Sequence, residues 1–484
     1  MNSNQLRTKF HGALFKNNCG RRKASGGLRK ALIPISLLSC VAALAVLRGP
    51  APLKAQEALS LEEAIRLALD HNPALRAADA AEGGASERVA AARGGYFPEV
   101  NYSESFQWGN NPVYVFGSLL QQHRFQASNF DLPSLNRPDA LTNFSSQLTA
   151  EHVVFDGNKA RDRWRSAQLG LEMTREQQRQ ARMDVLAAVA GAYYGVVLAR
   201  ENHQVAEEAL ATAEADLERA LALRQAGMTT DADVLSLRVS RSEQQERLIR
   251  AENDFELAQA RLNDWMGAPL TAGYTFSSSL RPAPAVEMGM PQAEAQALEQ
   301  RPEALQAKIA LNLAQAQGRL AQAELLPEIK VMGTFEASRQ GFASRGGSNW
   351  MTGATLRWNL FRGGEDRARR AETSFLQTQR VEEQRQVSSA LRLEVRQAFL
   401  SLEAANRRMD VGEAAMAQAE ESHRITANRY DAGLANVTEL LHSQTSWSEA
   451  KTRYLAAVFD QRVATIMVEH AAGTLNPSSE ALRP

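Results

Sequence analysis

The sequence predicts an α+β membrane protein of two tandem structural repeats, each with two β-strands and long α-helical hairpins. Three observations support this fold class. The chain repeats its own motifs at a nearly constant offset, and long proline-free stretches carry the 3.6-residue period of helices. The segments between helices alternate apolar and polar residues as barrel strands do. Together these patterns predict membrane strands joined to long helices outside the membrane.

The duplication appears in paired motifs along the chain. The pairs are NPALRAA (72–78) with RPEALQA (301–307), and VVFDGN (153–158) with NLFRGG (359–364). The first pair is offset by 229 residues and the second by 206, which persists to Gly267 and Gly473. The 23 extra residues of the first copy fall within 109–140, a stretch rich in Asn, Ser and Pro that we expect to be a long loop.

The expected domains follow from this duplication. A signal peptide at 1–55 precedes a first repeat at 56–290, a second at 291–474 and a tail at 475–484.

Helical periodicity and proline spacing define the expected helices. In order they are 60–71, 73–94, 158–226, 231–266, 291–300, 302–325, 364–432 and 436–472. At 1.5 Å per residue, the two longest would each extend roughly 100 Å. Gly227 and Gly433 stand where a helix needs a glycine just after its end, so each long helix should fold back into a hairpin.

A two-residue period predicts the strands. They are expected at about 96–108, 141–155, 327–342 and 349–361, and 100–108 places Val100, Tyr102, Phe106 and Trp108 on one face. Glu104 is the exception on that apolar face. Four strands cannot close a barrel, and open edges are unfavourable in lipid. Three chains sharing a barrel would supply twelve strands and twelve helices.

The N-terminal segment resembles an export signal. Residues 1–55 contain ten basic and no acidic residues, and most of the basic residues precede an apolar run at 31–47. We expect cleavage after Ala55, with acylation of Cys40 or a permanent anchor as alternatives. Removal of this leader leaves 45 basic and 55 acidic residues. Both cysteines also lie in the leader, so the remaining chain has no thiol. No later stretch is expected to be a transmembrane helix.

These residues resemble the TolC family of outer-membrane efflux proteins. The motifs are LSLEEAIRLALDHNPAL (59–75), LNDWMGAPL (262–270), LPEI (326–329), LRWNLFRGG (356–364) and RYDAGLANVTELLHSQ (429–444). The resemblance covers about 59–474 and implies an outer-membrane homotrimer with a twelve-stranded barrel and a twelve-helix periplasmic tunnel. It also implies an exit duct for efflux or type I secretion that works with a periplasmic adaptor and an inner-membrane transporter.

The resemblance also implies a gate at the hairpin tips. Glu439 and His442 match positions that line the tunnel constriction, Asp233 matches one that holds the closed gate, and Tyr430 matches its aromatic partner. The tips expected to touch the adaptor are Gly227, Met228, Thr229, Gly433, Leu434 and Ala435. Ala435 stands where the family's best-known member has a basic gate residue, which predicts a looser lock.

Symmetry would turn Glu439 and His442 into rings of three. Crowded carboxylates raise one another's pKa values and favour cations, and an imidazole ring titrates near neutral pH. Three imidazoles with nearby carboxylates would also suit a divalent ion such as zinc. The alternative is that both residues are ordinary solvated positions of an exposed helix.

Several function classes have no support in the residues. No HExxH pair or phosphate-binding glycine loop appears, so we expect no enzyme activity, no resident metal and no cofactor. The mature charge of −10 without a basic stripe argues against nucleic-acid binding. Two alternatives to a channel remain at this point, a periplasmic adaptor and a structural coiled coil.

Overall fold

Two very long helices dominate the structure. The computed structural model describes residues 58–276 and 278–483, so the expected signal peptide and Cys40 lie outside the described residues. The long helices are α5 (Lys159–Gln225) and α9 (Glu365–Asp431), each of 67 residues. Each would span about 100 Å at 1.5 Å per residue.

Each long helix folds back into a hairpin. Helix α6 (Asp231–Met266) packs on α5, and α10 (Val437–Ala472) packs on α9. The shorter helices are α1 (Leu61–His71), α2 (Pro73–Arg93), α7 (Met290–Gln300) and α8 (Pro302–Ala323). All these bounds lie within two residues of the ranges that periodicity and proline spacing predict. Pro73 and Pro302 each open a helix, where a missing N–H costs little.

Four strands form one antiparallel sheet in the order β2-β3-β5-β6. They are β2 (Glu99–Gly109), β3 (Leu141–Phe155), β5 (Glu328–Arg339) and β6 (Gly347–Arg357). Strand β6 ends at Arg357, short of the expected end at 361. The reason is local: the Trp358 indole N–H donates to the Leu325 carbonyl at 3.1 Å, where the chain turns toward α9.

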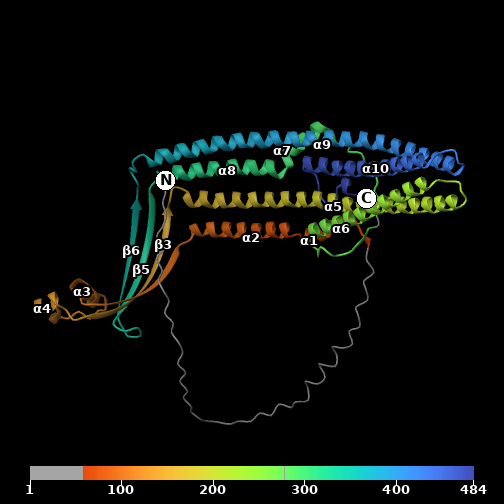
Figure 1. Ribbon diagram of the computed structural model, residues 1–484. Coiled ribbons are helices and arrows are strands. Elements are labelled where there is room, and N and C mark those ends of the chain that lie inside the picture. The colour runs from red at the N-terminus through yellow and green to blue at the C-terminus, as the bar shows by residue number, and fades with distance from the viewer. Residues whose placement is uncertain (1–57, 277, 484) are drawn as a thin grey trace, which may run out of the picture. The chain divides into compact units, whose positions relative to one another are not determined.

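Strands and helices follow the same lateral order. Strand β2 continues from α2, β3 leads into α5, β5 continues from α8, and β6 leads into α9. Near the sheet the helices pack as α2-α5-α8-α9, and toward the hairpin tips as α6-α5-α10-α9 (Figure 1). The described chain is therefore a layer four elements wide, with β2, α2 and α6 at one edge and β6 and α9 at the other.

A belt of short segments covers one side of this layer at mid-length. We use the name belt for residues 58–71, 268–276, 278–289 and 474–483. It contains the parallel pair β1 (Ala58–Leu59) and β4 (Thr275–Phe276) together with α1. The Tyr193 hydroxyl of α5 donates to the Leu59 carbonyl at 3.0 Å, and the main hydrophobic core lies between α5, α6 and the belt.

The segment expected to be a long loop is folded. Helix α3 (Pro112–Gln121) and helix α4 (Leu132–Asn136) occupy residues 109–140. Helix α3 begins because the Asn111 side chain accepts from the backbone N–H of Val113 and Tyr114, and Pro112 takes the first helical position. Abundant Asn and Pro therefore marked a helix start rather than continuous loop.

The expectation of no transmembrane helix after the leader needs one correction. By length and composition α5 is apolar enough to cross a membrane, and half of its most apolar window is buried within the protein. Val189, Val196 and Val197 in this stretch lie in the main core. The apolar content therefore reflects packing against α6 and the belt.

Candidate functional site

The hairpin tips reverse the chain through matching glycines. Gly227 and Gly433 have φ values of +74° and +72°, and a Cβ at either would meet nothing within 4 Å. Their requirement is therefore conformational, because side chains rarely adopt this backbone region. Met228 and Leu434, the next residues, are 74% and 69% exposed. Both tips thus present an exposed apolar side chain.

Asp233 and Glu439, predicted at the gate from matching repeat positions, are each the third residue of a helix and are hydrogen-bonded to its capping residue. Asp233 forms a capping box with Thr230: the Asp233 N–H donates to the threonine hydroxyl at 3.2 Å, and the Thr230 N–H donates to the carboxylate at 3.2 Å. Hydrogen bonds from Thr230 and Thr229 lower the pKa of Asp233. In the second repeat the Glu439 N–H donates to Asn436 Oδ1 at 2.9 Å.

The expected pairing of Tyr430 with Asp233 differs from the contacts in one chain. Every side-chain hydrogen bond found for Asp233 in the described residues goes to Thr229 or Thr230. Burial raises the pKa of Tyr430, and the charges of Asp216 and Asp233 raise it further. Asp233 is therefore near Tyr430 without bonding to it, since capping the helix occupies the carboxylate.

A tie between the two hairpins was not predicted from the sequence. Arg219 Nη1 of α5 lies 2.6 Å from Asp431 Oδ1 of α9, next to Tyr430. Asp216, one turn before Arg219, is 8% exposed, and its Oδ2 has no hydrogen-bond partner in the described residues. Burial raises the pKa of Asp216, and Arg219 partly offsets that rise. The two partners are far apart in sequence. Asp431 lies in the motif at 429–444, whereas no sequence pattern singled out Arg219.

Glu439 and His442 lie one turn apart on α10 and are both exposed in a single chain. No group of three or more His, Cys, Asp or Glu side chains in the described residues could hold a metal ion. A zinc site at this position would need residues from several chains. In one chain the Glu439 carboxylate accepts a hydrogen bond from Asn436 Nδ2 at 3.0 Å.

The sheet has one apolar and one polar face. The apolar face exposes Tyr102 by 67%, Trp108 by 71% and Trp350 by 77%, as expected for strands facing lipid. Glu104 on this face is neutralised by Arg339, whose Nη2 lies 2.9 Å from its carboxylate, and the Tyr102 hydroxyl donates to it at 2.8 Å. The exception noted in the sequence is therefore an ion pair across the sheet.

Helix α3 lies against the polar face at the end of the sheet remote from the long helices. Gln122 Nε2 donates to Asn143 Oδ1 at 2.8 Å, and Asn349 Nδ2 donates to the Gln121 carbonyl at 3.4 Å. Asn143 and Asn349 belong to the polar face by the strand register. Gln122 is 2% exposed and Asn143 is 4% exposed. In a closed barrel, this helix would lie within the outer mouth.

Comparison with known proteins identifies the family. A family model described as "Outer membrane efflux protein" matches residues 64–268 and 295–474. The chain belongs to this family. The match spans both repeats and confirms the resemblance to TolC-type proteins. The family consists of channels, and an outer-membrane exit duct for efflux or secretion is the function of this family member.

Relatives and solved structures agree with this membership. The chain is 27% identical over 440 residues to protein CyaE of Bordetella pertussis, covering 89% of this chain and 87% of CyaE. It is 25% identical over 314 residues to the pyoverdine export outer membrane protein OpmQ of Pseudomonas aeruginosa, covering 63% and 65%. The duct function excludes the adaptor and the structural coiled coil as alternatives.

The fold matches solved outer-membrane channels. The Campylobacter jejuni CmeC channel superposes with a TM-score of 0.75 at 16% identity, covering 87% of each chain. The Vibrio cholerae protein VceC gives 0.70 at 18% identity, covering 85% of this chain and 96% of VceC. This outer membrane efflux protein therefore has the TolC-like fold, with its strands in the outer membrane and its helices in the periplasm.

Proposed function

We propose that this efflux protein is a homotrimer whose duct opens at the hairpin tips and works with a periplasmic adaptor and an inner-membrane transporter. The observation that carries the proposal is that both edge strands of the four-stranded sheet lack a second hydrogen-bonding partner. Among the described strands, β2 and β6 each have one neighbour only. Unpaired strand edges are costly in lipid, so β2 of one copy would pair with β6 of the next.

The helical edges support the same assembly. Helix α6 exposes Leu235, Val239 and Ile249, and α9 exposes Leu393, Leu400, Val411 and Ile425. The α9 residues recur on one side of that helix, away from its buried residues Val395 and Leu402. An apolar stripe at each edge of a layer suits head-to-tail packing, which closes a ring when the rotation allows it. Three copies would give the twelve strands of a barrel and the twelve helices of a tunnel.

The gate belongs at the tips. Glu439 and His442 would form rings around the opening, and Asp233, Tyr430 and the Arg219–Asp431 tie would hold the hairpins together. The exposed tips Gly227–Thr229 and Gly433–Ala435 would receive the adaptor. Release of the hairpins from one another would widen the duct.

Single-channel conductance of the purified trimer in a planar bilayer tests the gate. Asp233→Ala should raise the conductance several-fold, because the carboxylate no longer ties the hairpin start. Thr230→Ala is the matched control, since it removes the other half of the same capping box and keeps the charge. An equal rise in both variants would assign the effect to the cap, and no channel in any variant would reject the duct.

Ion selectivity tests the proposed rings. Glu439→Ala should reduce the preference for cations, because it removes the carboxylates from the opening. Added zinc should block the wild type and not His442→Ala, because the imidazoles would hold the ion. Unchanged selectivity and zinc response in the double variant would show that these two residues are solvated surface positions.

A further inference from the structure

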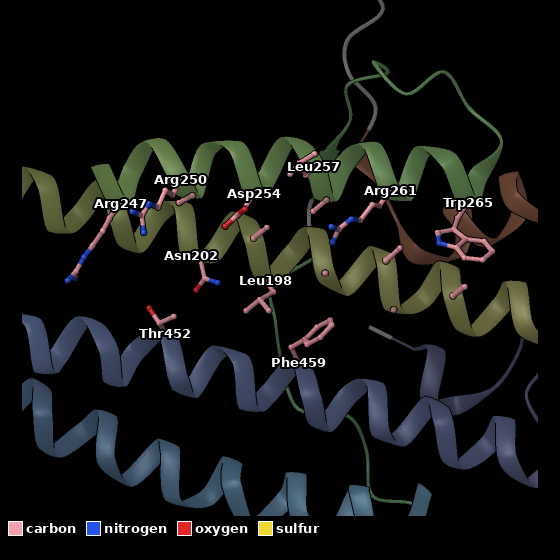
Figure 2. Close-up of a pocket in the computed structure, with 17 residues that line it drawn as sticks. Leu198, Asn202, Arg247, Arg250, Asp254, Leu257, Arg261, Trp265, Thr452 and Phe459 are labelled. Atoms are coloured by element: carbon pink, nitrogen blue, oxygen red, sulfur yellow. The ribbon is translucent and has the colours of Figure 1, made fainter. Parts of the chain in front are cut away.

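A basic groove lies between α5, α6 and α10, at the level of the belt. Its cavity has a volume of about 670 Å³, and an adjoining cavity of about 390 Å³ shares Asn202, Arg247 and Thr452 with it. Figure 2 shows Arg247, Arg261 and other α6 side chains above the groove, with Thr452 and Phe459 of α10 below. The continuous groove has room for a molecule of drug size.

The floor of the groove is made of small residues from α5. These residues are Ala188, Gly191, Ala192, Gly195 and Ala199. A Cβ at Gly191 or Gly195 would meet nothing within 4 Å, so neither glycine is required by packing within the chain. The small residues therefore leave open space on the groove side of α5, while the opposite side of this helix is packed in the main core.

The charges of the groove are unbalanced. The larger cavity is lined by Arg247, Arg250 and Arg261 and by one acid, Asp254, and the adjoining cavity adds one residue of each sign, Arg453 and Glu449. Arg250 pairs with Glu246, whereas no ion pair or hydrogen bond of the Arg247 or Arg261 side chains is found in the described residues. Two arginines of each chain are thus free to bind an anion, and the guanidinium group matches carboxylates, sulfonates and phosphates with paired hydrogen bonds.

Unsatisfied polar atoms point to a ligand as well. Asn202 Oδ1 and Gln244 Oε1 are buried and lack hydrogen-bond partners in the described residues, and Gln244 is only 4% exposed. Both residues line the adjoining cavity. Buried polar atoms are normally paired, so rotation of either side chain toward the adjoining cavity would offer its oxygen to a ligand that brings a donor. The indole of Trp265 and the ring of Phe459 add apolar surface.

The groove opens on the side of the layer opposite the belt. On α5, Arg200 Nη2 donates to the Ser278 carbonyl of the belt at 2.7 Å, while Asn202 lines the groove. On α6, Asn263 Nδ2 donates to the Ala272 carbonyl at 2.8 Å, while Arg261 and Trp265 line the groove. Two residues turn an α-helix by about 200°, so belt contacts and groove residues lie on opposite faces.

This geometry places the groove inside the duct. A ring of twelve helices about 9 Å apart leaves an opening of about 25 Å. Three copies of the belt would fill that opening, so the belt must surround the ring and the opposite face must line the tunnel. We propose that the groove is a contact site in the tunnel wall for anionic cargo with an aromatic or amphipathic body, an inference that rests on the proposed duct.

The duct would then select ions by charge at two levels, at the hairpin tips and at the groove. Three symmetry-related grooves would place six unpaired arginines around the tunnel at mid-length, against three aspartates. Rings of arginine favour anions in pores, while the proposed Glu439 ring at the tips favours cations. The groove would concentrate anionic cargo that has already passed the gate.

Direct binding tests the chemistry of the site. The trimer in detergent at low salt is titrated calorimetrically with naphthalene-1-sulfonate and, separately, with 1-naphthylmethylammonium, against protein-free micelles. We expect up to three sulfonate sites per trimer, binding of the cation at least tenfold weaker, and a tenfold loss of sulfonate affinity in Arg247→Gln/Arg261→Gln.

The matched control is Arg238→Gln/Arg385→Gln. It removes the same charge from exposed positions of α6 and α9 outside the groove. Equal losses in the two double variants, or equal affinity for the two naphthalenes, would overturn the site. Conductance of all variants is recorded in parallel: an absent channel rejects the duct, whereas an intact channel without sulfonate binding rejects only the groove.

Cysteine accessibility tests the placement. Thr452→Cys lies in the groove, and Glu252→Cys lies two residues from Arg250, on the opposite face of α6. The only native cysteines, Cys19 and Cys40, precede the described residues. Each variant therefore has a single thiol within the described part of the chain. An anionic methanethiosulfonate reagent should change conductance at Thr452→Cys and not at Glu252→Cys. A change of conductance at Glu252→Cys and not at Thr452→Cys would overturn the placement in the tunnel. Modification of Thr452→Cys only after the trimer dissociates would also overturn it, because a neighbouring chain would then cover the groove.

Discussion

At the scale of single residues, a buried ionic cluster joins the long helices. Arg301, whose side chain is 4% exposed, places Nη1 2.8 Å from Glu394 of α9. His470 Nε2 of α10 lies 2.8 Å from Asp184 of α5. Burial alone would lower the pKa of His470, but Asp184 and Glu394 raise it to about 9, and His470 with Arg301 lowers the pKa of Glu394 to about 2. Each charge is compensated, so the cluster holds α5, α9 and α10 in one arrangement.

The raised pKa of His470 predicts a stability that falls in alkaline solution. The folded state binds this proton more tightly than the unfolded state, so the contribution is complete below pH 6.5 and is lost as the pH rises through about 9. The loss should be on the order of 2 to 3 kcal/mol per chain. Thermal unfolding followed by circular dichroism should show the decline in the wild type and a nearly flat profile in His470→Gln. Parallel profiles would contradict the assignment.

At the scale of elements, α3 is tied to the polar face of the sheet by close backbone contacts. The Tyr114 hydroxyl donates to the Gln107 carbonyl at 2.9 Å and the Leu141 carbonyl at 3.2 Å. A Cβ on Gly347 would overlap the Gln121 carbonyl oxygen and lie 2.7 Å from His123 Cδ2. This glycine therefore allows α3 to lie directly on β6.

Replacing this glycine predicts a wider outer mouth. Gly347→Ala should displace α3, at a cost of about 1 to 3 kcal/mol for overpacking. The single-channel conductance measured with the inner gate opened by Asp233→Ala should then increase. Gly353→Ala is the matched control, because it lies on the same polar face of β6 and its Cβ would meet nothing within 4 Å. Equal conductance of the two variants would show that α3 does not narrow the mouth.

At the scale of the whole molecule, one chain cannot satisfy its own edges. Strands β2 and β6 each lack a second partner in the described sheet, and α6 and α9 expose apolar stripes on the outer sides of the same layer. The lateral order of strands and helices is the same, so one rotation between copies would pair both the strands and the helices. The barrel and the tunnel should therefore assemble together.

A charge on the α9 stripe predicts dissociation of the trimer. Leu400, 54% exposed in one chain, would become buried against the neighbouring α6, and an aspartate there would lack a partner. Leu400→Asp should shift the mass of the detergent-extracted protein, measured by light scattering, from three chains toward one. Ser401→Asp is the control, since Ser401 is exposed but lies beside the stripe. A stable trimer in Leu400→Asp would place the interface elsewhere.

Local chemistry made most of the helices predictable. The α6 bounds Asp231–Met266 are those expected from the sequence, because Thr230 caps the start and Gly267 follows the end with a φ of +68°. Duplication also revealed that Asp233 and Glu439 occupy matching positions. In the structure each donates its backbone N–H to the side chain that caps its helix, Thr230 or Asn436. The segment at 109–140 was misjudged, since a short helix held by side-chain contacts to distant strands leaves no long period in the sequence.

The sequence by itself determined the repeats, the hairpins, the two-faced strands and the family resemblance, because these depend on neighbouring residues and on periods of 2.0 or 3.6. Only the tertiary structure decided which repeat elements meet. It paired β3 with β5 across the two repeats, joined Arg219 to Asp431 across 212 positions, and placed α3 on the polar face. It also revealed the basic groove, whose lining comes from α5, α6 and α10. Such contacts depend on how distant segments pack, and no local pattern records that packing.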